Sequence, residues 1–179
     1  MIYMFGYIKR KTKVNQSMNK TLSVCFVCHG NICRSPLAQG VMESLVKQEG
    51  LEKSILISSA GVSGWHVGEP PDSRMQDTAR EHDISLNSRG RHFQGHNFKQ
   101  MDLVLAMDHS NLDTLKSLRP EAETRDKLFL FRSFDPDNKG DLEVPDPYYG
   151  GEKGFELVFQ MVKRTCPKIL EYLKAQFTS

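Results

Sequence analysis

The sequence predicts an α/β fold: a single domain with a four-stranded, parallel, twisted sheet and helices on both faces. Short β-branched or apolar runs alternate with longer segments of helical spacing, which is typical of parallel sheets covered by helices. The 179 residues fit one domain, and no segment has the composition of a linker. The expected strands cover residues 22–27, 55–61, 101–107 and 127–131, and the expected helices begin near Pro36, Asp72, Ser110 and Glu152.

Local signals support each element. The strand segments LSVCFV (22–27) and MDLVLAM (101–107) are largely apolar, which favours burial on both faces of the sheet. Gly50 follows the first helix as a C-cap, Asp72 precedes the second helix as an N-cap, and Pro120 ends the third.

The last helix follows a long loop. Residues 132–151 are rich in Asp, Pro and Gly, and their number exceeds that of an ordinary connection. From Glu152 onward the apolar residues follow helical spacing, and we expect Pro167 to kink this helix. Because long loops inside compact domains often carry function, residues 132–151 are a candidate part of a site.

Charge is distributed unevenly along the chain. The net charge is +2, but residues 1–20 hold five Lys or Arg and no acid, which leaves the rest of the chain at −3. We expect residues 1–20 to form a flexible basic extension and residues 21–179 to form the folded domain. The body lacks the basic excess of nucleic-acid-binding proteins, and no apolar run after residue 20 is long enough to cross a membrane. We therefore expect a soluble protein that binds neither nucleic acid nor membrane.

Cysteine usage indicates a reducing compartment. Of the four Cys, Cys25, Cys28 and Cys33 fall within nine residues. Four Cys are too few for a disulfide scaffold, and the crowding of three of them favours catalysis or metal binding. The first 20 residues also lack the charge order of a secretory signal, so the expected location is cytoplasmic.

The segment CHGNICRS (28–35), which follows the first strand, combines anion-binding groups with a nucleophile. The N–H groups of such a turn and of the following helix form a nest for a phosphate-like dianion, at a turn that Gly30 makes possible. Arg34 adds a guanidinium that can bind two oxygens at once. The same positive field favours the thiolate form of Cys28, to which the Ser35 hydroxyl can donate. A phosphate-binding loop that contains a thiolate predicts a phosphatase site that needs neither metal nor cofactor.

Such a reaction also needs a general acid, because an unprotonated alkoxide or phenoxide is a poor leaving group. Asp146 lies in the long loop between two prolines that stiffen its backbone, and it is our candidate. Asp108, at the end of the third strand, is more simply explained as the N-cap of the next helix.

At this point the sequence resembles the low-molecular-weight protein tyrosine phosphatases. The resemblance covers about residues 22–177 and rests on VCHGNICRSPLA (27–38), SAGVSGWHVGEPPD (59–72), MDHSN (107–111) and DPYYGG (146–151). It implies hydrolysis of phosphotyrosine in proteins, and of small aryl phosphates, through a phosphocysteine on Cys28. Arg34 would hold the transition state, and Asp146 would act first as acid and then as base.

The resemblance also implies how the substrate is bound. Asn31 and Ser35 would hold the loop, with Ser59 as a further hydrogen-bond partner, and Trp65 and Tyr148 would flank the phenyl ring. The complete set of expected substrate- and phosphate-binding residues is His29, Gly30, Asn31, Ile32, Cys33, Ser35, Trp65 and Tyr148.

Two positions depart from the resemblance. Ser88 stands where members of the family often carry a His that supports the loop, so that network is expected to be weaker or rebuilt. His29 replaces a commonly small or apolar residue after the nucleophile, where it either tunes substrate choice or points to solvent. The remaining histidines, His66 among them, show no paired spacing and are interpreted as surface or loop residues.

Relatives with the same fold include arginine phosphatases and arsenate reductases, so the fold alone does not decide the substrate. The resemblance associates Ile at position 32 with phosphotyrosine and Thr there with phosphoarginine. Arsenate reduction resembles a relay among several cysteines, for which the chain offers only Cys166 downstream, on a helix expected to pack it inward.

Two further hypotheses concern the crowded cysteines. A non-catalytic zinc module would use Cys25, Cys28, Cys33 and His29, but no second Cys or His pair stands at a suitable spacing. Cys33 is either a small buried residue or the partner of a reversible disulfide that shelters Cys28 from irreversible oxidation.

Overall fold

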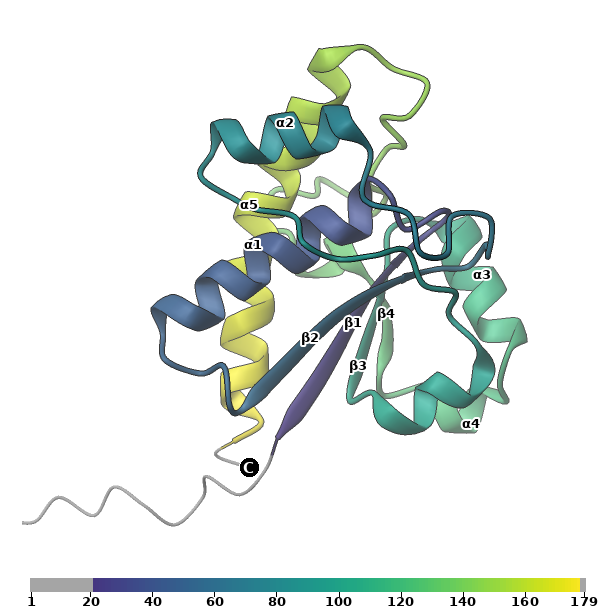
Figure 1. Ribbon diagram of the computed structural model, residues 1–179. Coiled ribbons are helices and arrows are strands. Elements are labelled where there is room, and N and C mark those ends of the chain that lie inside the picture. The colour runs from purple at the N-terminus through teal and green to yellow at the C-terminus, as the bar shows by residue number, and fades with distance from the viewer. Residues whose placement is uncertain (1–20, 178–179) are drawn as a thin grey trace, which may run out of the picture.

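A computed structural model describes residues 21–177, and Figure 1 shows one sheet between two groups of helices. The strands are β1 (Leu22–Cys28), β2 (Ile55–Gly61), β3 (Leu103–Ala106) and β4 (Leu128–Leu130). They pair in the order β2-β1-β3-β4, and every pairing is parallel. The predicted sheet is confirmed, whereas the prediction for residues 1–20 lies outside the described residues.

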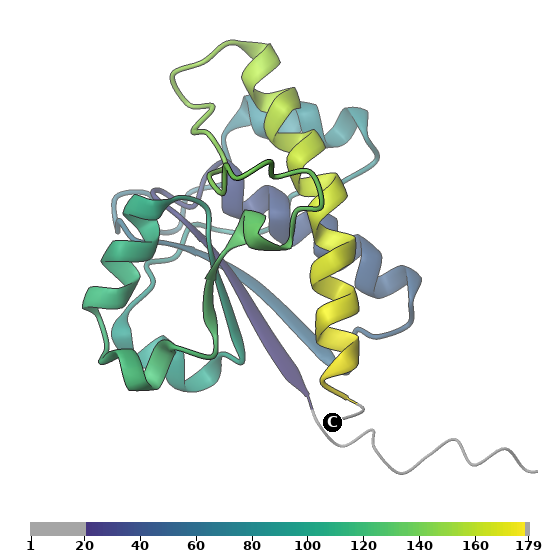
Figure 2. The same ribbon diagram turned by 180° about the vertical axis from the view of Figure 1, so that it is seen from behind.

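The helices divide between the two faces of the sheet, as Figures 1 and 2 show. The first group comprises α1 (Arg34–Gln48), α2 (Ser73–Glu81) and α5 (Glu152–Ala175). The second comprises α3 (His109–Ser117) and the short α4 (Glu121–Thr124). None of the described helices is long and apolar enough to cross a membrane.

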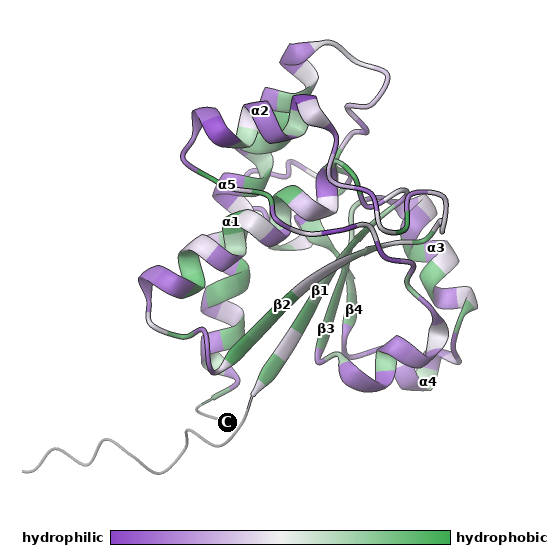
Figure 3. Cartoon of the chain, viewed as in Figure 1, coloured by the Kyte–Doolittle hydropathy of each residue, from purple (hydrophilic) through white to green (hydrophobic). Residues whose placement is uncertain are grey.

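Alternation along the strands builds one apolar core on each face. Val24 and Phe26 of β1 belong to the core beneath α1 and α5, whereas Cys25 and Val27 belong to the core on the opposite face. Figure 3 shows strands that are largely hydrophobic, between helices in which hydrophilic and hydrophobic residues are mixed. This packing fixes the carboxyl end of β1, where Cys28 lies, in the interior of the protein.

The helix caps follow the sequence signals. Asp72 accepts a hydrogen bond from the N–H of Arg74, and Asp108 accepts one from Asn111. At the end of α1, Gly50 takes a left-handed φ of 67°, and the N–H of Leu51 bonds to the carbonyl of Val46 at 2.9 Å. This is the bond pattern of a glycine-terminated helix, as predicted.

Several boundaries differ from those predicted. Helix α1 begins at Arg34, because Pro36 is accommodated in the first turn where its missing N–H has no partner to lose. Strands β3 and β4 are shorter than their apolar runs, and α4 was not predicted. Helix α5 continues on both sides of Pro167, since its buried face extends over the whole core.

Candidate active site

The turn between β1 and α1 presents unpaired backbone donors beside a buried thiol. Cys28 is the last residue of β1, and Cys33 precedes α1 without a side-chain cap. No acidic residue lies in the first turn of α1, so its N–H groups and the positive end of its dipole are available to an anion. The sequence alone predicted this anion-binding geometry.

Glycine plays a different part in this turn from the one expected. The left-handed residue is Asn31, with φ 59°, and not Gly30. A side chain at Gly30 would instead meet the His66 ring, whose Cδ2 lies 3.0 Å from the position of an added Cβ. Gly30 therefore admits the neighbouring loop, while Asn31 makes the sharp turn, as Asn does more readily than most residues.

The thiol of Cys28 is held by two groups of the turn. Its Sγ lies 3.0 Å from the Ser35 Oγ and accepts a hydrogen bond from the N–H of Asn31 at 3.3 Å. Cys28 is only 3% exposed, so the reactive atom lies at the bottom of a depression. These two contacts fix the position of the sulfur at the start of the turn.

Asn31 connects the turn to the neighbouring strand and loop. Its side-chain amide donates to Ser35 Oγ and to Ser59 Oγ, both at 2.9 Å, and its Oδ1 accepts the N–H of Arg91 at 2.9 Å. Within residues 21–177, Ser88 is not among the partners of Asn31. The hydrogen bonds that hold Asn31 therefore do not involve Ser88. The Arg91 backbone N–H provides the third of them.

Arg34 is the central charge of the site. Its guanidinium donates to Asp108 at 2.6 Å, to Asp146 at 2.7 Å and to the carbonyl of Val144 at 3.1 Å. Burial opposes the charged form, but Cys28, Asp146 and Asp108 together raise the pKa of the Arg34 guanidinium above its usual value. Asp108 therefore has a second role that the N-cap interpretation missed, since the cap uses one carboxylate oxygen and Arg34 the other.

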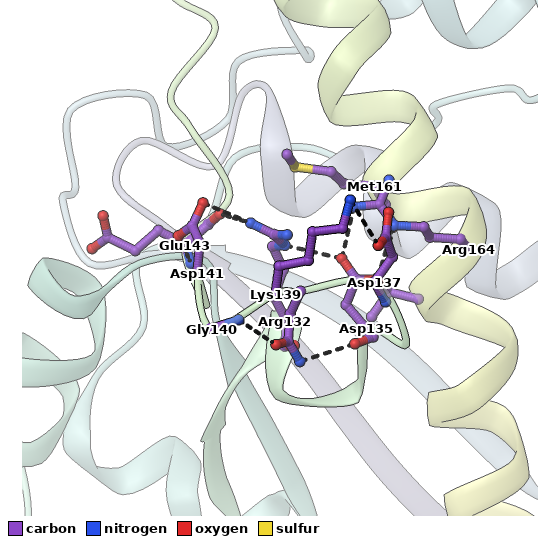
Figure 4. A network of polar contacts seen from close by, with 11 residues as sticks. Arg132, Asp135, Asp137, Lys139, Gly140, Asp141, Glu143, Met161 and Arg164 are labelled. Atoms are coloured by element: carbon purple, nitrogen blue, oxygen red, sulfur yellow. Dashed lines mark hydrogen bonds and ion pairs between the residues drawn. The ribbon is translucent and has the colours of Figure 1, made fainter.

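The loop that carries Asp146 is anchored by a buried ionic network (Figure 4). Arg132 donates to Asp135 and Asp141, both at 3.0 Å, and to the carbonyl of Glu143 at 2.9 Å. Arg164 of α5 completes the network with two bonds to Asp135 at 2.8 Å. The network thus fixes the backbone three residues before Asp146, whose side chain remains 41% exposed.

A pocket of about 270 Å³ opens above Cys28. Its walls include the predicted catalytic residues Cys28, Arg34 and Asp146 and most of the predicted binding residues: His29, Gly30, Ile32, Cys33, Trp65 and Tyr148. His66 and Tyr149, which were not predicted, also line it. Trp65 and Tyr149, 86% and 93% exposed, stand at its mouth. A phosphorylated aromatic ring has the size and the polarity that this pocket accommodates, with the charged group at the bottom and aromatic walls above.

The loop with Trp65 holds residues that sequence reasoning placed outside the site. His66 lines the pocket, and its Nδ1 lies 2.6 Å from a carboxylate oxygen of Glu69. Gly90 allows the backbone to pack closely against this loop, because a Cβ there would lie 2.0 Å from the His66 carbonyl oxygen. The position of His66 next to the single Trp, in a glycine-rich loop, was the signal that could have identified it.

Two of the other three cysteines are separated from Cys28, whereas Cys33 shares its pocket. Cys25 faces the opposite core, and burial raises the pKa of its thiol to about 11. The zinc hypothesis is therefore wrong, because Cys25 and Cys28 lie on different faces of the sheet. Burial also raises the pKa of Cys166, which packs against the Ala38 carbonyl of α1. Cys33 lines the pocket with a pKa raised chiefly by burial, and its disulfide with Cys28 stays a prediction.

Comparison with known proteins agrees with this geometry. The sequence pattern described as "Low molecular weight phosphotyrosine protein phosphatase" matches residues 23–179. The chain belongs to this family. A low molecular weight protein-tyrosine-phosphatase of Streptomyces coelicolor is 43% identical over 157 residues, which cover 87% of this chain and 96% of that protein.

Solved structures of this phosphatase fold superpose over nearly their whole length. A protein tyrosine phosphatase of Entamoeba histolytica, crystallised with Hepes in its active site, is 35% identical with a TM-score of 0.82, covering 87% of this chain and 99% of that one. A Drosophila arginine phosphatase is 33% identical with a TM-score of 0.76, covering 84% and 97%. The family is a hydrolase family, and the fold accommodates more than one substrate.

Proposed function

We propose that the chain hydrolyses phosphotyrosine in proteins, and small aryl phosphates, through a covalent phosphocysteine. The observation that carries this proposal is the position of Cys28 at the bottom of an aromatic pocket, with Arg34 and Asp146 in the same walls. The Asn31 N–H donates to the Cys28 sulfur, and the Ser35 Oγ lies 3.0 Å from it. Family membership supports the reaction class.

In the first step, the Cys28 thiolate attacks phosphorus in line with the bond to the phenolic oxygen. Arg34 and the N–H groups of residues 29–35 hold the equatorial oxygens, whose charge they offset in the transition state. The S–P bond forms as the P–O bond to tyrosine breaks. Asp146 gives its proton to the phenolic oxygen, so that tyrosine leaves as a neutral phenol.

Asp146 must leave Arg34 for this step. In the structure its carboxylate accepts from Arg34 at 2.7 Å, and a bound phosphate would compete for the same guanidinium. In the second step the carboxylate takes a proton from water, which attacks phosphorus and releases phosphate from Cys28.

Phosphoarginine is the second candidate substrate, because an arginine phosphatase shares the fold. Ile32 lines the pocket beside Cys28 and narrows the space that a guanidinium would need. The test compares turnover of a phosphotyrosine peptide and a phosphoarginine peptide by the wild type and by Cys28→Ser. We expect a phosphotyrosine preference that disappears in the variant. Faster turnover of phosphoarginine would reverse the assignment, and activity of the variant would exclude Cys28 as nucleophile.

The proposed location is a cytoplasmic, reducing compartment. All four cysteines are free thiols, and a thiolate nucleophile requires reducing conditions to stay active. Fractionation of cells that produce the chain tests this, and recovery of the protein outside the cytoplasm would contradict it.

A further inference from the structure

The start of α2 lies between the turn after β1 and the end of the long loop. The N–H of Asp72, which precedes α2, donates to the carbonyl of Ile32 in the turn at 2.8 Å. Two residues later, the guanidinium of Arg74 donates to the carbonyl of Tyr148 at 3.2 Å. Helix α2 also packs against α5, which follows the long loop (Figure 1). The start of α2 therefore connects two parts of the active site that are far apart in the sequence.

The guanidinium of Arg74 is held in one orientation by Asp72. Its Nε and Nη2 donate to the two carboxylate oxygens of Asp72 at 3.0 and 2.7 Å, which makes a bidentate ion pair. The carboxylate is itself fixed, because it also accepts the Arg74 N–H as the cap of α2 and its side chain is only 11% exposed. These bonds direct the remaining nitrogen, Nη1, toward the Tyr148 carbonyl.

Two aromatic rings contact the same guanidinium. Its Cζ lies 4.7 Å from the centre of the buried Phe155 ring, at the start of α5, and 5.4 Å from the centre of the Tyr148 ring. A guanidinium within about 6 Å of the centre of an aromatic face is attracted to it. Arg74 therefore binds Tyr148 through both its carbonyl and its ring, and Tyr148 is one wall of the pocket above Cys28.

Tyr148 in turn holds the proposed acid. Its N–H donates to Oδ1 of Asp146 at 3.1 Å, whereas Arg34 binds Oδ2. A phosphate above Cys28 would compete for Arg34, but the bond from the Tyr148 N–H involves none of the phosphate-binding groups. Once Arg34 is engaged by phosphate, the orientation of the carboxyl group depends on Tyr148. The position of Tyr148 depends on Arg74.

We propose that Arg74 is a positioning residue that holds Asp146 in place for proton transfer, acting through Tyr148. The inference rests on the proposed function and specifies how its acid is oriented. Arg74 is not among the residues that line the pocket, so its removal leaves the phosphate-binding groups unchanged. Its loss should therefore resemble a partial loss of the acid, with the largest effect on substrates whose leaving group needs a proton.

The test measures kcat/KM for phenyl phosphate and for a nitrophenyl phosphate, whose leaving group needs little help from an acid. Because kcat/KM covers the steps up to the transfer of phosphate to Cys28, a change in the ratio of the two values reports the contribution of the acid to that transfer. A general loss of folded protein, or of the aromatic wall, lowers both values together and leaves the ratio unchanged.

The variants change one side chain of α2 at a time. Arg74→Met keeps an unbranched stem against Phe155 and removes every donor, whereas Arg74→Lys keeps the charge without the planar fork. Arg80→Met is the matched control, because Arg80 lies on the same helix and its exposed guanidinium pairs with Asp77 of that helix. Arg74→Met is also combined with Asp146→Asn.

We expect Arg74→Met to lower kcat/KM at least five-fold for phenyl phosphate and less than two-fold for the nitrophenyl phosphate. Arg74→Lys should shift the ratio in the same direction, and Arg80→Met should keep the wild-type ratio. In the Asp146→Asn background, Arg74→Met should leave the ratio unchanged, because no acid remains to be positioned. Arg74→Lys applies the same test should Arg74→Met not fold.

An unchanged ratio in both Arg74 variants would overturn the inference. So would a further change of the ratio when Arg74→Met is added to Asp146→Asn, because Arg74 would then act through another group. Either result leaves the proposed function intact. If the wild type turned over neither substrate, or if Asp146→Asn lowered both values equally, the proposed function or its acid would fail, and this inference with it.

Discussion

Arg34 joins the phosphate site to the acid loop through a single side chain. It lies in the first turn of α1 and reaches Asp108 after β3, as well as Val144 and Asp146 of the long loop. A lysine has one point charge in place of the planar fork and could not satisfy these acceptors together. Arg34 therefore holds Asp146, the proposed acid, at the edge of the pocket that contains Cys28.

The role of Asp146 can be separated from that of Arg34 by the leaving group. We expect Asp146→Asn to reduce kcat by about 10²- to 10⁴-fold for phenyl phosphate, whose leaving group needs a proton, and far less for a nitrophenyl phosphate. Steady-state kinetics on a series of aryl phosphates measures this. Equal losses along the series would contradict the assignment of Asp146 as acid. Asp141→Asn, in the same loop but bonded to Arg132, is the matched control.

At the scale of elements, the position of the loop after β2 depends on close contact between its backbone and that of the segment after α2. The Gly68 N–H donates to the Gly90 carbonyl at 2.8 Å, and the Gly90 N–H donates to the Glu69 carbonyl at 2.9 Å, which ties residues 64–69 to the segment after α2. The Gly61 N–H also bonds to the Arg91 carbonyl at 2.7 Å, next to the Arg91 N–H that holds Asn31. The aromatic wall and the phosphate-binding turn are therefore supported by the same few residues.

This close backbone contact predicts that alanine at position 90 and alanine at position 64 have different effects on activity. Gly90→Ala places a Cβ 2.0 Å from the His66 carbonyl and must displace the loop with Trp65, so we expect kcat/KM for phosphotyrosine peptides to fall at least ten-fold. Gly64→Ala, in the same loop, gains only an ordinary contact of 3.4 Å with His92. Equal activity of the two variants would show that the loop tolerates movement.

The network behind the long loop predicts a pH-dependent stability. Burial opposes the charge of Asp135, but hydrogen bonds from Arg164, Asp137 and Arg132 outweigh it and lower the pKa of this carboxyl. A lowered pKa means that the stabilisation is present above the unfolded value, near 3.9, and is lost as the pH falls through the folded value. Arg132 and Arg164 would lose their shared anion in Asp135→Asn.

We therefore expect Asp135→Asn to lower the free energy of unfolding at pH 7 by about 3 kcal/mol. The difference from wild type should shrink as the pH falls below about 4, and urea denaturation at several pH values measures it. Asp137→Asn, whose exposed carboxylate lies 3.4 Å from Lys139, should change stability by less than about 1 kcal/mol. A difference that stays constant down to pH 2 would contradict this explanation.

At the scale of the whole molecule, the features that the sequence predicted correctly are those that depend on local sequence patterns. The parallel sheet followed from apolar strands alternating with helices, and the caps at Gly50 and Asp72 followed from residue type. Cys28, Arg34 and Asp146, the predicted catalytic residues, line one pocket, because carboxyl ends of parallel strands meet at one edge of the sheet.

The features of the site that were not predicted depend on contacts between segments far apart in the chain, which a local sequence pattern does not indicate. His66 enters the pocket because Gly30 and Gly90, far apart in the chain, both leave room for it. The second role of Asp108 requires Arg34 to lie 2.6 Å away across the turn. Similarly, Arg74 reaches the Tyr148 carbonyl only after the long loop has folded against α2.

The central claim is that phosphate is transferred to Cys28. The most direct measurement mixes the protein with a phosphotyrosine peptide for milliseconds, denatures it at a pH that preserves thiophosphate, and locates the phosphate by mass spectrometry. We predict phosphate on Cys28, with none on Cys33, and no labelled protein in Cys28→Ser. Phosphate on another residue would contradict the mechanism. So would turnover of a nitrophenyl phosphate, whose first step needs no acid, by Asp146→Ala without accumulation of the phosphoenzyme that the slowed second step should leave.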